Sequence, residues 1–151
     1  MQIYLDNLTG KKIATFLQEH LEEMHLYTPP ESVHALDLEE LRSPNITFWS
    51  AWKDDELLGC GALKQLDPKT GEIKSMRTAY GYRRKGIAGN ILEHIITEAK
   101  QRHYNSLKLE TGSSAEFAAA RALYLRYGFE YCSPFAEYID DPNSVFMTKN
   151  I

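Results

Sequence analysis

The chain has 151 residues, the length of a single domain spanning 1–151 that buries about two thirds of its unfolded surface. Charged residues make up 25% and hydrophobic residues 43%, as in ordinary globular proteins, and the net charge of −4 argues against a dedicated nucleic-acid binder. Because Met1 is followed by no signal segment and no apolar run approaches about 18 residues, we expect a cytoplasmic protein without a membrane partner.

The first half of the chain is predicted to contain one strand, two helices and then three strands. Pro29-Pro30 ends the first helix, and polar residues 53–56 form a hairpin turn between two strands. The periodicity of apolar residues predicts strands at 2–5, 46–52, 57–66 and 72–78, a helix at 11–25 and a shorter helix within 32–42.

The second half begins with a strongly periodic helix at 85–103, followed by a strand at 106–110. A strand-helix-strand crossover of this length favours parallel pairing of 72–78 with 106–110. Ser113-x-x-Glu116 predicts a capping box for a helix ending at Tyr127, and strands follow near 129–132 and 144–148. These elements predict an α/β fold with three layers.

The most informative segment is Arg83-Arg84-Lys85-Gly86-Ile87-Ala88-Gly89, which lies between a strand and the periodic helix. The first N–H groups of a helix have no partner within it, and the helix dipole is positive there. Glycine at 86 and 89 lets an anion approach the backbone closely. The chain lacks both familiar nucleotide-loop patterns, so the segment predicts a site for another phosphorylated ligand.

The spacing Arg83-x-x-Gly86-x-Ala88 resembles the acetyl-CoA signature of the GNAT N-acyltransferase superfamily. Downstream, Leu123-Tyr124 followed by Gly128-Phe129 is similar to a second segment of that family. The resemblance covers nearly the whole chain and lies closest to a branch of small, uncharacterised bacterial acetyltransferases. It implies a mixed, mostly antiparallel sheet flanked by helices, with two splayed parallel strands at its centre.

By this resemblance the donor is acetyl-CoA, used as a cosubstrate. Its pyrophosphate would lie on the N–H groups of residues 84–89, with the cations of the loop adding charge and Asn90 near the phosphates. Strand residues would offer main-chain groups to the pantetheine arm. The expected donor-binding residues are Met76, Arg77, Thr78, Arg83, Arg84, Lys85, Gly86, Ile87, Ala88, Gly89 and Asn90.

The same resemblance places Tyr124 at the family's general-acid tyrosine. Two carboxylates compete for the role of general base: Glu72, at the start of its strand, and Glu110, at the end of the next. Either carboxylate could instead form a surface ion pair with Lys74 or Lys108. The sequence leaves this choice open.

The acceptor is expected to be a primary amine of a small molecule or a peptide, and the sequence contains no pattern that identifies it. Candidate residues for its pocket are His25, Tyr27, Glu31, Ser32, His34 and Tyr138. The alternative function is an acyl-CoA-binding sensor without turnover. Cys60 and Cys132 match no metal-ligand spacing, so we expect reduced thiols and no metal, and we leave a homodimer open as the oligomeric state.

Overall fold

A central seven-stranded sheet organises the computed structural model, which describes all residues from 1 to 151. The strand order is β1-β2-β3-β4-β5-β7-β6, and every neighbouring pair is antiparallel except β4 with β5. The strands are β1 (Gln2–Leu5), β2 (Ile46–Lys53), β3 (Glu56–Asp67), β4 (Thr70–Thr78), β5 (Ser106–Gly112), β6 (Glu130–Cys132) and β7 (Ser144–Asn150). The helices are α1 (Lys11–Tyr27), α2 (Leu38–Leu41), α3 (Ile87–Gln101) and α4 (Ala118–Arg126).

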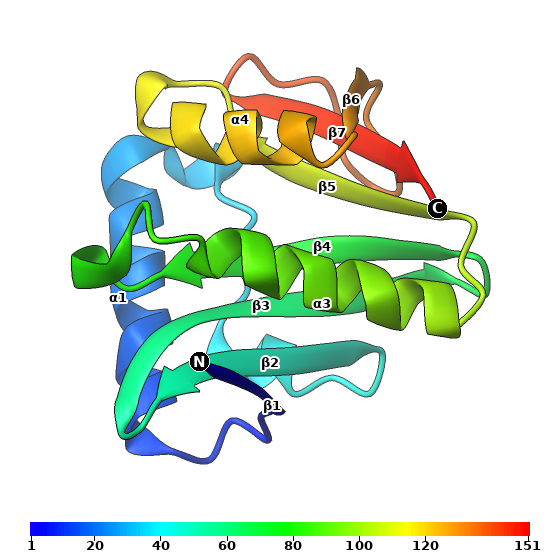
Figure 1. Cartoon of the computed structure of the whole chain (residues 1–151). Helices are drawn as coiled ribbons and strands as arrows, with labels where there is room; N and C mark the ends of the chain where they lie inside the picture. The colour runs from blue at the N-terminus through cyan, green and yellow to red at the C-terminus, as the bar shows by residue number, and fades with distance from the viewer.

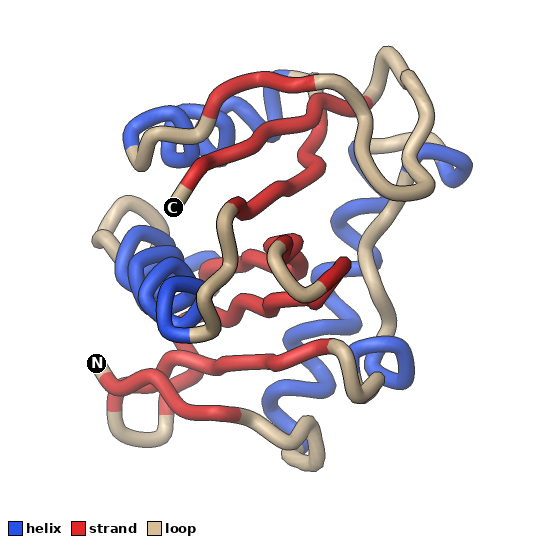
Figure 2. Tube along the Cα trace, turned by 90° about the vertical axis from the view of Figure 1, so that its right-hand side faces the viewer, coloured by secondary structure: helices blue, strands red, loops and turns tan.

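The helices cover both faces of the sheet, as Figures 1 and 2 show, with α3 and α4 on one face and α1 and α2 on the other. Strand β3 illustrates why: Leu63 packs into the core under α3, whereas Cys60 and Ala62 pack under α1. Gly61 allows α3 to approach closely, since a Cβ there would lie 2.8 Å from Ile91. The expected three-layer α/β arrangement is therefore confirmed.

The two parallel strands separate soon after they meet. Pairing between β4 and β5 is limited to residues 70–72 with 106–108, although β4 continues to Thr78 and β5 to Gly112. A bulge in β4 opposite Gly61, where Ser75 has φ 55°, bends the strand at this point. Beyond Glu72 the edge of β4 that faces β5 has no strand partner, which confirms the expected splay of the central parallel strands.

The segment before α4 differs from its prediction. Ser113 does not form a capping box with Glu116, because its Oγ donates a hydrogen bond to the carbonyl of Pro142 at 2.6 Å. A 3₁₀ turn at Ala115–Phe117 follows, and α4 begins only at Ala118. Ser113 is therefore used to hold the loop before β7 rather than to start the helix.

One short helix is confirmed within its predicted range, and α3 starts later than predicted. The region 32–42 contains a helix of one turn, Leu38–Leu41, capped by a box in which the carboxylates of Asp37 and Glu40 accept each other's main-chain N–H. Helix α3 starts at Ile87 instead of residue 85, because Arg84 and Gly86 adopt left-handed conformations that no helix can contain. None of the helices combines the length and hydropathy that crossing a bilayer requires.

Candidate active site

The loop between β4 and α3 presents a row of free backbone N–H groups. The φ angles of Arg84 and Gly86 are 65° and 82°, and they turn the chain sharply before α3. The N–H groups of residues 84–89 donate to no backbone acceptor, and hydrogen bonding resumes where the Asn90 N–H donates to the Gly86 carbonyl at 3.0 Å. Such a row of donors at a helix N-terminus is suited to bind phosphate oxygens.

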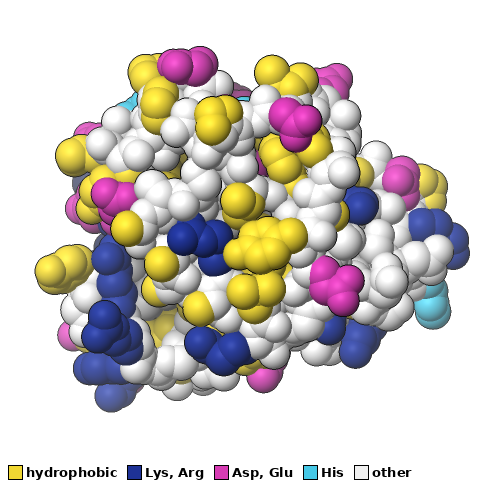
Figure 3. All heavy atoms as spheres, turned by 90° about the horizontal axis from the view of Figure 1, so that it is seen from above, with side chains coloured by type: hydrophobic (Ala, Val, Ile, Leu, Met, Phe, Trp, Pro, Cys, Tyr) yellow, Lys and Arg dark blue, Asp and Glu magenta, His cyan; other side chains and the backbone are white.

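The cations of this loop are exposed at one end of the molecule. Figure 3 shows Lys and Arg side chains gathered at the left, the end at which the loop lies in Figure 1. The Arg84 guanidinium has no ion-pair partner, whereas the Lys85 ammonium lies 5.4 Å from the centre of the Tyr82 ring. The side chains of Arg84 and Lys85 are thus free to meet an anion.

The first turn of α3 is packed against α4. Ile87 is buried in the core, Ala88 is half-buried and Asn90 is exposed. A Cβ at Gly89 would lie 2.8 Å from the hydroxyl oxygen of Tyr127, the residue after α4, so a larger residue at position 89 would displace that side chain. The space that a side chain would fill at position 89 is occupied by Tyr127, while the Gly89 N–H stays free.

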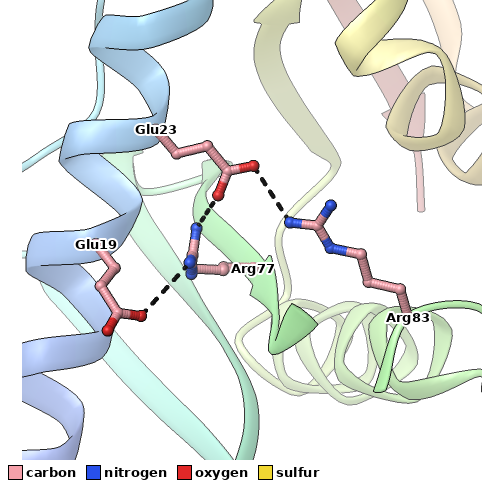
Figure 4. Close-up of polar contacts among 4 residues, drawn as sticks. All are labelled: Glu19, Glu23, Arg77 and Arg83. Carbon is pink, nitrogen blue, oxygen red and sulfur yellow. Dashed lines mark hydrogen bonds and ion pairs between the residues drawn. The ribbon is translucent and has the colours of Figure 1, made fainter. Parts of the chain in front are cut away.

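Arg83 and Arg77 share one carboxylate of α1, as Figure 4 shows. The Arg77 guanidinium donates to Glu23 at 2.6 Å and lies 3.8 Å from Glu19, and Arg83 donates to Glu23 at 3.2 Å. Burial opposes ionisation of Glu23, but the hydrogen bonds and charges of the two arginines lower its pKa. Because the Arg77 side chain is directed to α1, only its main chain remains available to the donor.

A cavity of about 160 Å³ lies where β4 and β5 separate. Its walls come from α1, the segment 28–35, β4, β5, α4 and the loop before β7. The polar side chains of the lining are His20, Thr28, Ser32, His34, Lys74, Ser75, Glu110, Thr111, Tyr124 and Asn143. Met76, expected on the donor path, lines the same cavity.

Glu110 and Tyr124 both line this cavity, and they lie close enough for the charge of Glu110 to act on the Tyr124 phenol. Burial raises the pKa of Glu110 to about 7; Glu72 and Asp141 act in the same direction, and Lys74 and the nearby Ser144 hydroxyl oppose it. The Ser144 hydroxyl forms no hydrogen bond of good geometry, so burial dominates. Burial also raises the pKa of the Tyr124 phenol, and the charge of Glu110 adds to this effect.

Glu72, the other expected base, does not line the cavity. It is 2% exposed and accepts hydrogen bonds from the Tyr138 hydroxyl at 2.5 Å and the Lys74 ammonium at 3.2 Å. Burial, followed by the charge of Glu72, raises the pKa of Tyr138. Glu72 therefore holds two neighbouring side chains, whereas Glu110 is open to the cavity.

Comparison with known proteins agrees with this geometry: residues 13–129 match the profile of the acetyltransferase (GNAT) family. The chain belongs to the GNAT acetyltransferase family. It is 60% identical to an uncharacterised N-acetyltransferase, YsnE of Bacillus subtilis, over the full length of both chains. It is 49% identical to another, YedL of Escherichia coli, over 99% of this chain and 94% of the other.

The GNAT fold is also found in a solved structure. A GNAT family acetyltransferase from Elizabethkingia anophelis, crystallised with acetyl-CoA bound, superimposes with a TM-score of 0.67 at 20% identity, covering 99% of this chain and 97% of the other. The resemblance to GNAT enzymes and to their small uncharacterised bacterial branch is thus confirmed. The protein is an N-acetyltransferase of this family.

The residues expected around the acceptor are only partly brought together by the structure. Of the residues expected around the acceptor, Ser32 and His34 line the cavity, whereas His25, Tyr27 and Glu31 do not. Tyr138 does not line the cavity either, and its hydroxyl is hydrogen-bonded to Glu72 and Lys74. The lining residues His20 and Asn143 were missed, and so was Lys74, although a lysine within a buried strand was a signal that could have identified it.

Proposed function

We propose that this GNAT enzyme transfers an acetyl group directly from acetyl-CoA to a primary amine of a small molecule or peptide. The observation that carries the proposal is the placement of Glu110 and Tyr124 in one cavity at the splay of β4 and β5. The pyrophosphate of the donor would lie on the free N–H groups of residues 84–89, next to Arg84 and Lys85. The pantetheine arm would follow the unpaired edge of β4 from Thr78 to Met76.

Glu110 is the better general base of the two carboxylates. An alkylammonium of pKa about 10.4 must lose its proton before it attacks, and transfer to an ordinary glutamate of pKa 4.5 would cost about 8 kcal/mol. Transfer to Glu110, whose pKa is about 7, costs about 5 kcal/mol, because each pKa unit corresponds to about 1.36 kcal/mol. Burial of Glu110 thus lowers the cost of activating the amine by about 3 kcal/mol.

Tyr124 supports departure of the CoA sulfur. The amine nitrogen forms a bond to the thioester carbon, the carbon–sulfur bond breaks, and the thiolate, of pKa about 8.5, takes up a proton. Because the pKa of Tyr124 is raised, its phenol stays protonated and donates a hydrogen bond to the sulfur as negative charge develops. The products are an amide, free CoA and one released proton.

Thiol release from acetyl-CoA over a panel of amines tests this proposal, with the acetylated product identified by mass. We expect turnover that falls about 10- to 100-fold in Tyr124→Phe, since one transition-state hydrogen bond is lost. Tight CoA binding without thiol release for any amine would contradict turnover and favour an acyl-CoA sensor. Turnover that is equal in wild type and Tyr124→Phe would remove the Tyr124 hydrogen bond from the mechanism.

A further inference from the structure

The cavity is small and its lining is largely polar. Its volume of about 160 Å³ is below the roughly 300–1,000 Å³ of pockets for drug-sized ligands. Of the 18 lining residues only 8 are hydrophobic, and the others include His20, Ser75, Lys74 and Glu110. The size and the polar lining suit a small, polar occupant.

Lys74 provides the fixed positive charge of this cavity. Its side chain is 8% exposed and lines the wall formed by β4. Burial, followed by the positive charge of Arg77, lowers the pKa of His20 to about 4. Burial and Lys74 lower the pKa of His34 as well. Both histidines are therefore neutral at pH 7, and Lys74 is the remaining cation of the lining.

The Lys74 ammonium has one N–H to spare. It donates to Glu72 at 3.2 Å and to the Tyr138 oxygen at 3.0 Å, and these are its only acceptors in the chain. An ammonium group has three N–H donors, so one is left for a ligand. The Glu72 and Tyr138 contacts hold Lys74 in place, which reduces the conformational entropy that a ligand contact would otherwise cost.

We infer that the acceptor is a small amino acid whose carboxylate is bound by Lys74 while its amino group faces Glu110. The inference rests on the proposed acetyl transfer to an amine. An amino acid carries one charge of each sign, and the cavity lining has the Lys74 ammonium and the Glu110 carboxyl. These two groups lie close enough for the charge of Lys74 to act on Glu110.

Matched pairs of substrates test this inference without any variant. Serine is compared with ethanolamine and alanine with ethylamine, because each pair differs only by the carboxylate, and the common amino acids complete the panel. We expect kcat/KM about 10- to 100-fold higher for the amino acids, as one charge-assisted hydrogen bond implies. Equal or faster turnover of the decarboxylated amines would overturn the inference and leave the proposed function standing. Absence of turnover with any amine would refute both.

A charge-neutral double variant then assigns the preference to Lys74. Lys74→Met alone would leave the Glu72 carboxylate buried without its cation, which destabilises a fold strongly. Glu72→Gln/Lys74→Met removes both charges and should abolish the preference for the carboxylate. Lys108→Met is the control. Lys108 lies opposite Glu72 in the strand register, donates a hydrogen bond to Thr148 and does not line the cavity. A preference that survives in the double variant would exclude Lys74 as its source.

Discussion

The loop proposed to bind the donor and the cavity proposed to bind the acceptor are built in opposite ways. The loop consists of consecutive residues from 83 to 90 and offers main-chain N–H groups and exposed cations. The cavity is assembled from separate segments of the chain and offers buried side chains such as Glu110 and Lys74. A site made of backbone can keep its ligand while its side chains change, whereas a site made of buried side chains changes its ligand with them. The first arrangement suits a common donor and the second a particular acceptor.

Loss of the base should separate the two regions most clearly. In Glu110→Gln we expect kcat to fall about 100- to 1,000-fold with unchanged CoA affinity, because only the acceptor side loses a group. In wild type, log kcat should rise with pH up to about 7, because Glu110 must lose its proton to act as the base. Burial, Glu72 and Asp141 raise the pKa of Glu110, and the Ser144 hydroxyl and Lys74 lower it. The rise of log kcat with pH should be absent in Glu110→Gln. Stopped-flow or steady-state thiol release from pH 5 to 9 measures both effects, and an unchanged pH limb would reassign the base.

The same substitution should stabilise the protein in a pH-dependent way. The pKa of Glu110 is about 7 in the folded protein against 4.5 unfolded, so the folded state resists ionisation and loses stability as the pH rises between these values. Glu110→Gln should therefore gain up to about 3 kcal/mol above pH 7 and little below pH 4.5. Urea unfolding at pH 4.5 and 8 measures the difference, with the exposed Glu130→Gln as control. A gain that is equal at both pH values would argue against the buried carboxylate.

A change in the loop backbone should have the opposite pattern. Gly86 has φ 82°, and alanine there costs about 1–2 kcal/mol or moves the N–H groups of the turn. We expect Gly86→Ala to weaken CoA binding about 10-fold while kcat at saturating donor stays near that of wild type. Open space surrounds the position where the new Cβ would lie, so crowding is not the cause. Calorimetric titration with CoA measures the change, and unchanged affinity would remove the N–H row from the donor site.

Removal of single charges from the loop should have the smallest effect. Arg84→Ala and Lys85→Ala each lose an exposed contact worth up to about 1 kcal/mol, so the Kd for CoA should rise about 2- to 5-fold. The effect should diminish as salt is added. Lys100→Ala, at the exposed far end of α3, is the control. If neither loop variant differs from that control, these side chains do not bind the donor.

The sequence was most informative where structure is local. Arg83, Gly86 and Ala88 with the helix behind them could be interpreted because helix starts and glycine conformations depend on neighbouring residues. The parallel pairing of β4 with β5 was predicted from the crossover length. Ser113 was misread because its partner, the Pro142 carbonyl, lies far along the chain.

The roles of Glu72 and Glu110 could not be separated from sequence for the same reason. Both are glutamates in strands beside a lysine, and only burial and tertiary partners distinguish them. Tyr138, which hydrogen-bonds to Glu72, is contributed by the loop between β6 and β7. Asn143 of the cavity comes from the same loop. The position of a long loop depends on what it packs against, and no local pattern encodes that.

The short pairing between β4 and β5 leaves a gap in the sheet that a bound donor could fill. Only three paired positions join the strands at the middle of the sheet, and beyond them each strand has a bare edge. A donor lying there would take the place of a missing strand and connect the two halves of the molecule. The amide hydrogens of β4 after residue 72 and of β5 after residue 108 that point into this gap, and not those paired with β3 or β7, should therefore exchange quickly in the free enzyme and slowly once CoA is bound. Slower exchange with CoA bound would mean that the donor supplies hydrogen bonds that the sheet itself lacks.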